Sequence, residues 1–164
     1  MGTDIAATLQ QGIWLENLGV LLPWQIQHQE LIKLGKPVIK TGSVHDEVYW
    51  YDCTILGGIA LPQLRALLEP RRVHPAAATP SRWCFQGVSA CVAMGERQGI
   101  IDCAAQVAGR LKKSLGNAID EASIGGYFYW AKWQFGATRV AVWTSEGDDL
   151  APHEHSCFIC CDQL

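Results

Sequence analysis

Tyr127 to Thr144 reads YFYWAKWQFGATRVAVWT, and this stretch does the most to decide the fold of the 164-residue chain. Aromatic and apolar side chains recur at every second position on both sides of Phe135-Gly136, the period that is typical of β-strands. A glycine between two such runs indicates a tight turn. The pattern therefore predicts a β-hairpin with strands over 127–133 and 138–144.

Two tryptophans of this stretch, Trp133 and Trp143, fall on the paired strands. Tryptophans on neighbouring strands can stack in a core or form an exposed recognition face. The sequence leaves both interpretations open.

Upstream of the hairpin, residues 101–115 have the spacing of an amphipathic helix. The apolar and small residues of one face are Ile101, Ala104, Ala105, Ala108, Leu111 and Leu115. Lys112 and Lys113 suit the negative end of a helix, and Gly116 follows as a cap. We expect this helix to pack closely on a sheet, because its side chains are small.

Three residue pairs of the first half of the chain recur, in similar form, in the second half. Leu34-Gly35, Tyr49-Trp50 and Leu56-Gly57 are followed, at offsets of 81, 80 and 79 residues, by Leu115-Gly116, Tyr129-Trp130 and Phe135-Gly136. Nearly constant offsets predict one structural unit used twice. The halves would cover about 1–70 and 82–164, joined by the Pro/Ala-rich connection 71–81, with Trp50 and Trp130 in a shared core role.

The remaining segments complete the predicted architecture. Expected helices cover 4–19 with Thr3 as N-cap, 23–34 with Gly35 as C-cap, and 63–68 between two prolines. Expected strands cover 47–53, 54–60 with a bend or bulge at Gly57-Gly58, 83–94 in one or two pieces, and 153–161. The sum is an α+β fold in a single domain, 1–164: a mostly antiparallel sheet with helices packed on one face, in two pseudo-repeated halves.

Composition narrows the functional classes. No basic residue precedes Lys33, so the positive start of a secretory signal is missing, and no apolar run is long enough to span a bilayer. The seven cysteines are irregularly spaced and odd in number, which favours reduced thiols. We therefore expect a cytoplasmic protein without disulfides or membrane spans.

Acidic residues gather near the C-terminal end. No Lys or Arg follows Arg139, whereas carboxylates accumulate at Glu146, Asp148, Asp149 and Glu154. Such a region repels nucleic acid and attracts a basic partner through interactions that weaken with salt. We predict these four residues as partner-binding residues, the alternative being a solvated loop that aids solubility.

A second cluster combines histidine and cysteine. His153, His155, Cys157 and Cys160 are metal-capable, and zinc would accept them. On a strand, however, residues 153, 155 and 157 project in line about 6.6 Å apart, which makes convergence on one ion difficult. We therefore predict no metal or other cofactor, and keep a zinc site formed by these four residues as the alternative.

Short segments of the first half resemble some bacterial polymorphic-toxin immunity proteins. The segments are Leu22-Pro23-Trp24-Gln25, Leu34-Gly35-Lys36-Pro37, Tyr49-Trp50-Tyr51-Asp52 and Ile55-Leu56-Gly57-Gly58. The resemblance implies a non-enzymatic cytosolic protein that neutralises one cognate toxin, delivered by contact or secretion, through direct binding. The alternatives are a small metal-dependent or thiol enzyme that uses the C-terminal His and Cys cluster, and a self-assembling structural protein.

Overall fold

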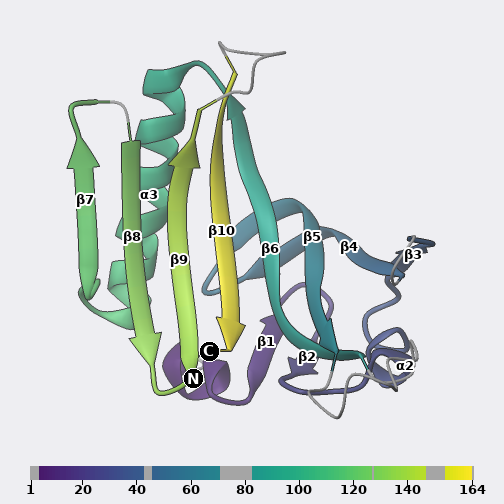
Figure 1. Ribbon diagram of the computed structural model, residues 1–164. Coiled ribbons are helices and arrows are strands. Elements are labelled where there is room, and N and C mark those ends of the chain that lie inside the picture. The colour runs from purple at the N-terminus through teal and green to yellow at the C-terminus, as the bar shows by residue number, and fades with distance from the viewer. Residues whose placement is uncertain (1–3, 43–45, 71–82, 127, 147–153, 164) are drawn as a thin grey trace.

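The computed structural model describes residues 4–42, 46–70, 83–126, 128–146 and 154–163, which form an α+β fold (Figure 1). Its helices are α1 (Ile5–Leu9), α2 (His28–Leu31) and α3 (Arg97–Leu115). The first five strands are β1 (Gly12–Leu15), β2 (Val20–Pro23), β3 (Val38–Lys40), β4 (Glu47–Ile55) and β5 (Ile59–Pro70). The next five are β6 (Trp83–Gly95), β7 (Asp120–Ile124), β8 (Phe128–Phe135), β9 (Thr138–Ser145) and β10 (His155–Gln163).

Eight of these strands form one antiparallel sheet. The spatial order is β3-β4-β5-β6-β10-β9-β8-β7, and β1 and β2 form a separate hairpin. The final strand, β10, therefore lies in the middle of the sheet, between β6 and β9 (Figure 1). The sheet therefore consists of two sets of four consecutive strands, β3–β6 and β7–β10. The two sets meet where β6 pairs with β10.

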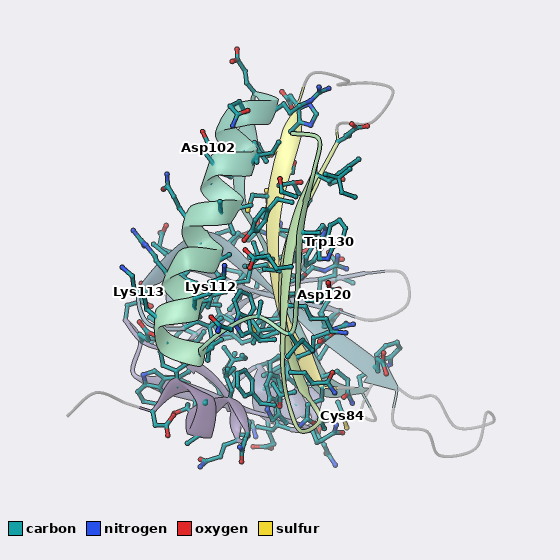
Figure 2. All side chains as sticks on the ribbon, turned by 90° about the vertical axis from the view of Figure 1, so that its left-hand side faces the viewer. Cys84, Asp102, Lys112, Lys113, Asp120 and Trp130 are labelled. Carbon is teal, nitrogen blue, oxygen red and sulfur yellow. The ribbon has the colours of Figure 1, made fainter. Side chains whose placement is uncertain are left out.

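The predicted helix over 101–115 is confirmed as the core of α3. It extends upstream to Arg97 and ends at Gly116, whose φ of 81° closes the last turn. Ala104 and Ala108 are fully buried, and α3 packs against β6, β8, β9 and β10. Figure 2 shows α3 lying along one side of the sheet. Among the described helices, none combines the length and apolar character needed to cross a membrane.

The predicted hairpin is confirmed in β8 and β9. Its two strands alternate between buried and more exposed residues, and the buried members join the core under α3. The predicted extended segment 83–94 is also confirmed, as one continuous strand. Gly87 is required within it, because a Cβ there would lie 2.3 Å from the carbonyl oxygen of Cys161 on β10.

The predicted helix over 4–19 is wrong beyond its first turns. Asp4 caps α1 by accepting the N–H of Ala7, and Thr3 lies outside the described residues. The helix ends at Leu9, and the chain then forms β1, in which Ile13 and Leu15 are buried. Pairing of β1 with β2 satisfies the backbone in this segment, so the spacing of four that predicted a longer helix was misleading.

The predicted helix over 23–34 is also mostly wrong, because only α2 is helical. The residues before it are hydrogen-bonded to β6: the N–H of Gln25 donates to the carbonyl of Phe85, and the N–H of Phe85 donates to the carbonyl of Ile26, each at 2.9 Å. Gln25 has a left-handed backbone, with a φ of 62°. Trp24 stacks on Phe85 at a ring distance of 5.5 Å. Backbone committed to these bonds cannot enter a helix.

The predicted short helix over 63–68 is a strand, part of β5. Leu64, Ala66 and Leu68 are buried, which is a period of two rather than 3.6. The strand expected over 47–53 is confirmed as part of β4. The strand expected over 54–60 is divided by a turn between the end of β4 and the start of β5. Gly57 and Gly58, expected as a bend or bulge, lie in the turn between them.

Trp50 and Trp130 do not share a core role, contrary to the prediction from the recurring pairs. Trp50 is 1% exposed and its indole N–H donates to the carbonyl of Leu34 at 2.9 Å. Trp130 is half-buried and lies on the side of the sheet away from α3 (Figure 2). The indole that matches Trp50 in its contacts is that of Trp133, which donates to the carbonyl of Gly116 at 2.9 Å.

Candidate functional site

An aromatic row crosses the side of the sheet that faces away from α3. The strand register pairs Trp130 with Trp143 and Trp143 with Phe158. Directly paired residues in a sheet point to the same side. All three rings are half-buried, and Trp143 stacks on Phe158 at a ring distance of 5.5 Å. Large rings that stay partly exposed on one face are typical of a surface that binds a partner.

The row continues into a concavity on the same side of the sheet. Phe158 pairs with Cys91 of β6, and both line a pocket of about 630 Å³. Tyr49 and Tyr51 of β4 form the far wall, where Tyr51 is 42% exposed. We call the surface formed by Trp130, Trp143, Phe158, Tyr49 and Tyr51 the aromatic face.

Where β4 and β5 form the pocket wall, charged and polar side chains are hydrogen-bonded to one another. Arg65 donates to Glu47 at 2.7 Å, and the hydroxyl of Tyr49 donates to the same carboxylate at 2.8 Å. This hydrogen bond is the main reason that the pKa of Tyr49 lies above its ordinary value. Lys40 lies 4.6 Å above the ring of Tyr49. Arg65 is thus positioned at the pocket by a fixed carboxylate.

The predicted acidic residues flank the connection between β9 and β10. Glu146 follows β9 directly, Glu154 immediately precedes β10, and both side chains are exposed. Ser145 and Ser156 pair at this end of the two strands, so the two carboxylates belong to the same end of the sheet. Asp148 and Asp149 lie outside the described residues. We call Glu146, Asp148, Asp149 and Glu154 together the acidic edge.

The alternative His and Cys site does not assemble among the described residues. His155 and Cys157 are buried on the α3 side of β10, whereas Cys160 alternates to the other side with Phe158. His153 lies outside the described residues. In the part of the chain that the structure describes, no three metal-capable side chains come together in a binding geometry.

The thiols of this strand are in their protonated state. Burial raises the pKa of Cys157 to about 12 and that of Cys160 to about 11. Burial also raises the pKa of Cys161, which is fully enclosed, well above the ordinary thiol value. A catalytic thiol needs the opposite shift, because the thiolate is the nucleophile. These cysteines act as small apolar core residues.

Comparison of the chain with protein-family models, with curated proteins and with solved structures gave no match.

Proposed function

We propose that this protein binds a cognate protein toxin in the cytoplasm and neutralises it by forming a direct complex. The proposed contact surface is the aromatic face, with the acidic edge at one end. The enzyme alternative, based on the C-terminal His and Cys cluster, has no comparable support. Cys160 lies on the other side of β10 from His155 and Cys157, and burial raises the pKa of both thiols above the ordinary value.

The observation that carries the proposal is the row of half-exposed rings at Trp130, Trp143 and Phe158. Tryptophan, tyrosine and arginine are the residues most enriched at binding hot spots, and this face carries all three types. A side chain used only for stability gains most from full burial, as at Trp133. Rings held on an uncovered side of a sheet are better explained by a partner that covers them.

The acidic edge supports a basic partner. Exposed carboxylates at the border of an interface speed association and set orientation more than they add affinity. Together with the resemblance to immunity proteins, this supports a toxin with a basic surface, such as a nuclease.

The test of function begins with cell survival. The chain is co-expressed with each candidate toxin encoded beside its gene, in a strain that the toxin kills. Survival with one toxin, together with a stable one-to-one complex of the purified proteins, would support neutralisation. Survival with none of them would contradict it.

The contact surface is tested with the toxin identified in that way. Replacing Trp143 and Phe158 together by alanine should weaken binding by about 30-fold or more, the usual effect of losing a hot spot. Leu18→Ala is the matched control, because Leu18 is also exposed, at 42%, but lies in the turn between β1 and β2. Equal affinities in calorimetry for the double variant and the control, with both proteins folded, would exclude the aromatic face.

The acidic edge is tested by association kinetics. Reversing Glu146, Asp148, Asp149 and Glu154 to lysine should lower the association rate constant by about tenfold at low salt, and by less at high salt. The control reverses four exposed acidic residues elsewhere: Glu30, Glu69, Asp102 and Asp120. An unchanged affinity and association rate in the first variant would remove the acidic edge from the interface.

We further propose that the chain contains a duplicated unit with helices on one face of the sheet, in copies over 28–95 and 97–163. These bounds differ from the expected halves 1–70 and 82–164, because β6 (Trp83–Gly95) is counted as the fourth strand of the first copy. The strand order supports duplication, because each helix, α2 and α3, is followed by four strands, and the two sets run outward from β6 and β10. In each set an indole of the second strand, Trp50 or Trp133, donates to a carbonyl near the preceding helix end. A crystal structure in which residues 28–95 superpose on 97–163 with these two indoles matched would support duplication. If the two segments superpose only when their strands are matched in a different order, duplication would be rejected.

A further inference from the structure

A second concave site shares no lining residue with the pocket of the aromatic face. It is a pocket of about 430 Å³ between α1, β1 and the turn that joins β4 to β5. Its walls are mainly apolar, formed by Ile5 and Leu9 of α1 and by Leu56 of the turn. A pocket of this size and character suits a small ligand or one long side chain.

Trp14 of β1 and Glu16, which directly follows the strand, give this pocket its chemistry. Both side chains line the pocket. Trp14 is 37% exposed, whereas its neighbours Ile13 and Leu15 are buried. A partly exposed indole that lines an apolar pocket can stack against a bound ligand.

The carboxylate of Glu16 is held in one position by backbone donors. One oxygen accepts the N–H of Gly57 at 2.5 Å and the other accepts the N–H of Gly58 at 3.0 Å. Each carboxylate oxygen can accept a further hydrogen bond. Among the described residues, no Lys, Arg or His forms an ion pair with Glu16. The pocket therefore contains a carboxylate that is held in place and that forms no ion pair within the part of the chain that the structure describes.

We propose that this pocket binds a group that joins an apolar body to a cationic head, such as an aliphatic or aromatic ammonium or a lysine side chain. The body fills the space against Ile5, Leu9 and Leu56. The cationic head pairs with the carboxylate of Glu16 and lies against the indole of Trp14. This site is separate from the proposed toxin interface, and it stands or falls independently of it.

The first test uses the unmodified protein and three probes of equal shape but different charge. Nuclear magnetic resonance titrations follow the methyl signals of Ile5, Leu9 and Leu56 and the indole N–H of Trp14. We expect 2-phenylethylammonium to bind about fivefold tighter than neutral 2-phenylethanol, and anionic 3-phenylpropionate to bind most weakly. Equal binding of all three probes, no saturable binding, or shifts only at other residues would overturn the proposal.

The second test removes the charge. Glu16→Gln should abolish the preference for the ammonium probe over the alcohol while the alcohol still binds, whereas Glu30→Gln, at an exposed glutamate on α2, should preserve the preference. Retention of the full preference in Glu16→Gln would overturn the role of Glu16. If Glu16→Gln loosens the turn, Trp14→Leu replaces it as the test variant and should weaken the ammonium probe more than the alcohol.

The source of the cation is distinguished by two further probes. Tighter binding of Nα-acetyl-lysine amide than of butylammonium would assign the site to a polypeptide side chain. The reverse order would assign it to a free amine. Failure of both to bind, when 2-phenylethylammonium also fails, contradicts the cationic site and leaves the toxin-binding test unaffected.

Discussion

Trp133 and Trp143 lie on neighbouring strands and have opposite environments. Trp133 is enclosed in the core and its N–H donates to the carbonyl of Gly116 at 2.9 Å. Trp143 pairs with Trp130 on the other side of the sheet and stays half-buried. Trp133 is therefore a core residue, whereas Trp143 is a partly exposed residue on the other side of the sheet. The sequence could not predict which tryptophan would be buried. Alternation along a strand divides its side chains between two sides of the sheet, but it does not tell which side the helix covers.

The two indoles should respond differently to the same change. Trp133→Phe loses a buried hydrogen bond and leaves a carbonyl and some space unfilled, so the free energy of unfolding should fall by about 2 kcal/mol. Trp143→Phe keeps a ring against Phe158 and should cost less than about 1 kcal/mol. Urea unfolding measures both, and a larger loss at Trp143 would contradict these environments.

The buried thiols predict a loss of stability in alkaline solution. Burial raises the pKa of Cys53 to about 11 and that of Cys157 to about 12, and it also raises the pKa of Cys161 well above its ordinary value. A raised folded-state pKa contributes stability that is present below the unfolded value, about 8.5, and is lost as pH rises through the folded value. Each such thiol should lower the free energy of unfolding by about 1.4 kcal/mol per pH unit in that window.

Urea unfolding at pH 7, 9 and 10 under reducing conditions checks this prediction. The variant with alanine at Cys53, Cys157 and Cys161 should be less stable at pH 7 but should lose stability less steeply above pH 9. Parallel slopes for the variant and the original protein would show that these thiols do not cause the alkaline loss.

At the scale of elements, α3 depends on small residues. Ala108 is fully buried where α3 meets the sheet, so Ala108→Leu should overpack this contact and lower the free energy of unfolding by about 1–3 kcal/mol. Ala105→Leu is the matched control, because Ala105 is exposed on the same helix. Thermal unfolding compares the two variants. Equal stability of both would mean that the close packing of α3 is not required.

Elements with a regular period over ten or more residues were predictable from the sequence. Residues 97–115 keep a helical period, and 128–145 keep a period of two on both sides of a glycine turn. The short N-terminal elements were not predictable in this way. The backbone of residues 25–26 is fixed by Phe85, nearly sixty residues away, and no local pattern reports such a contact.

At the scale of the whole molecule, one hydrophobic cluster joins both halves of the chain. It contains Trp50 of β4 and Trp133 of β8, together with residues of α3 and the central strands. A shared core should unfold as a unit. We expect the signals of both tryptophans, labelled with fluorine and followed by nuclear magnetic resonance, to lose their folded form at the same urea concentration. Separate midpoints would show two independently folding halves.

The candidate site was predictable only in part. Its acidic edge is a prediction from composition, because Glu146 and Glu154 belong to a cluster of carboxylates that no Lys or Arg follows. The aromatic face was not predicted, because Tyr51 and Phe158 are about a hundred residues apart in sequence and line one pocket only after the four strands β4, β5, β6 and β10 have paired. The alternation along each strand predicts which of its side chains lie on the same side of the sheet. It does not predict which residues of two strands lie opposite each other, because that register is set when the sheet folds.

The central position of β10 has a consequence for biosynthesis. Its neighbours, β6 and β9, are both made earlier, and each keeps one edge unpaired until residues 155–163 have left the ribosome. Open edges of this kind are templates for pairing with other chains. The growing polypeptide therefore cannot complete its sheet during translation of the first 154 residues. In that interval, chaperones that shield exposed strand edges would determine how much of the protein reaches its finished form.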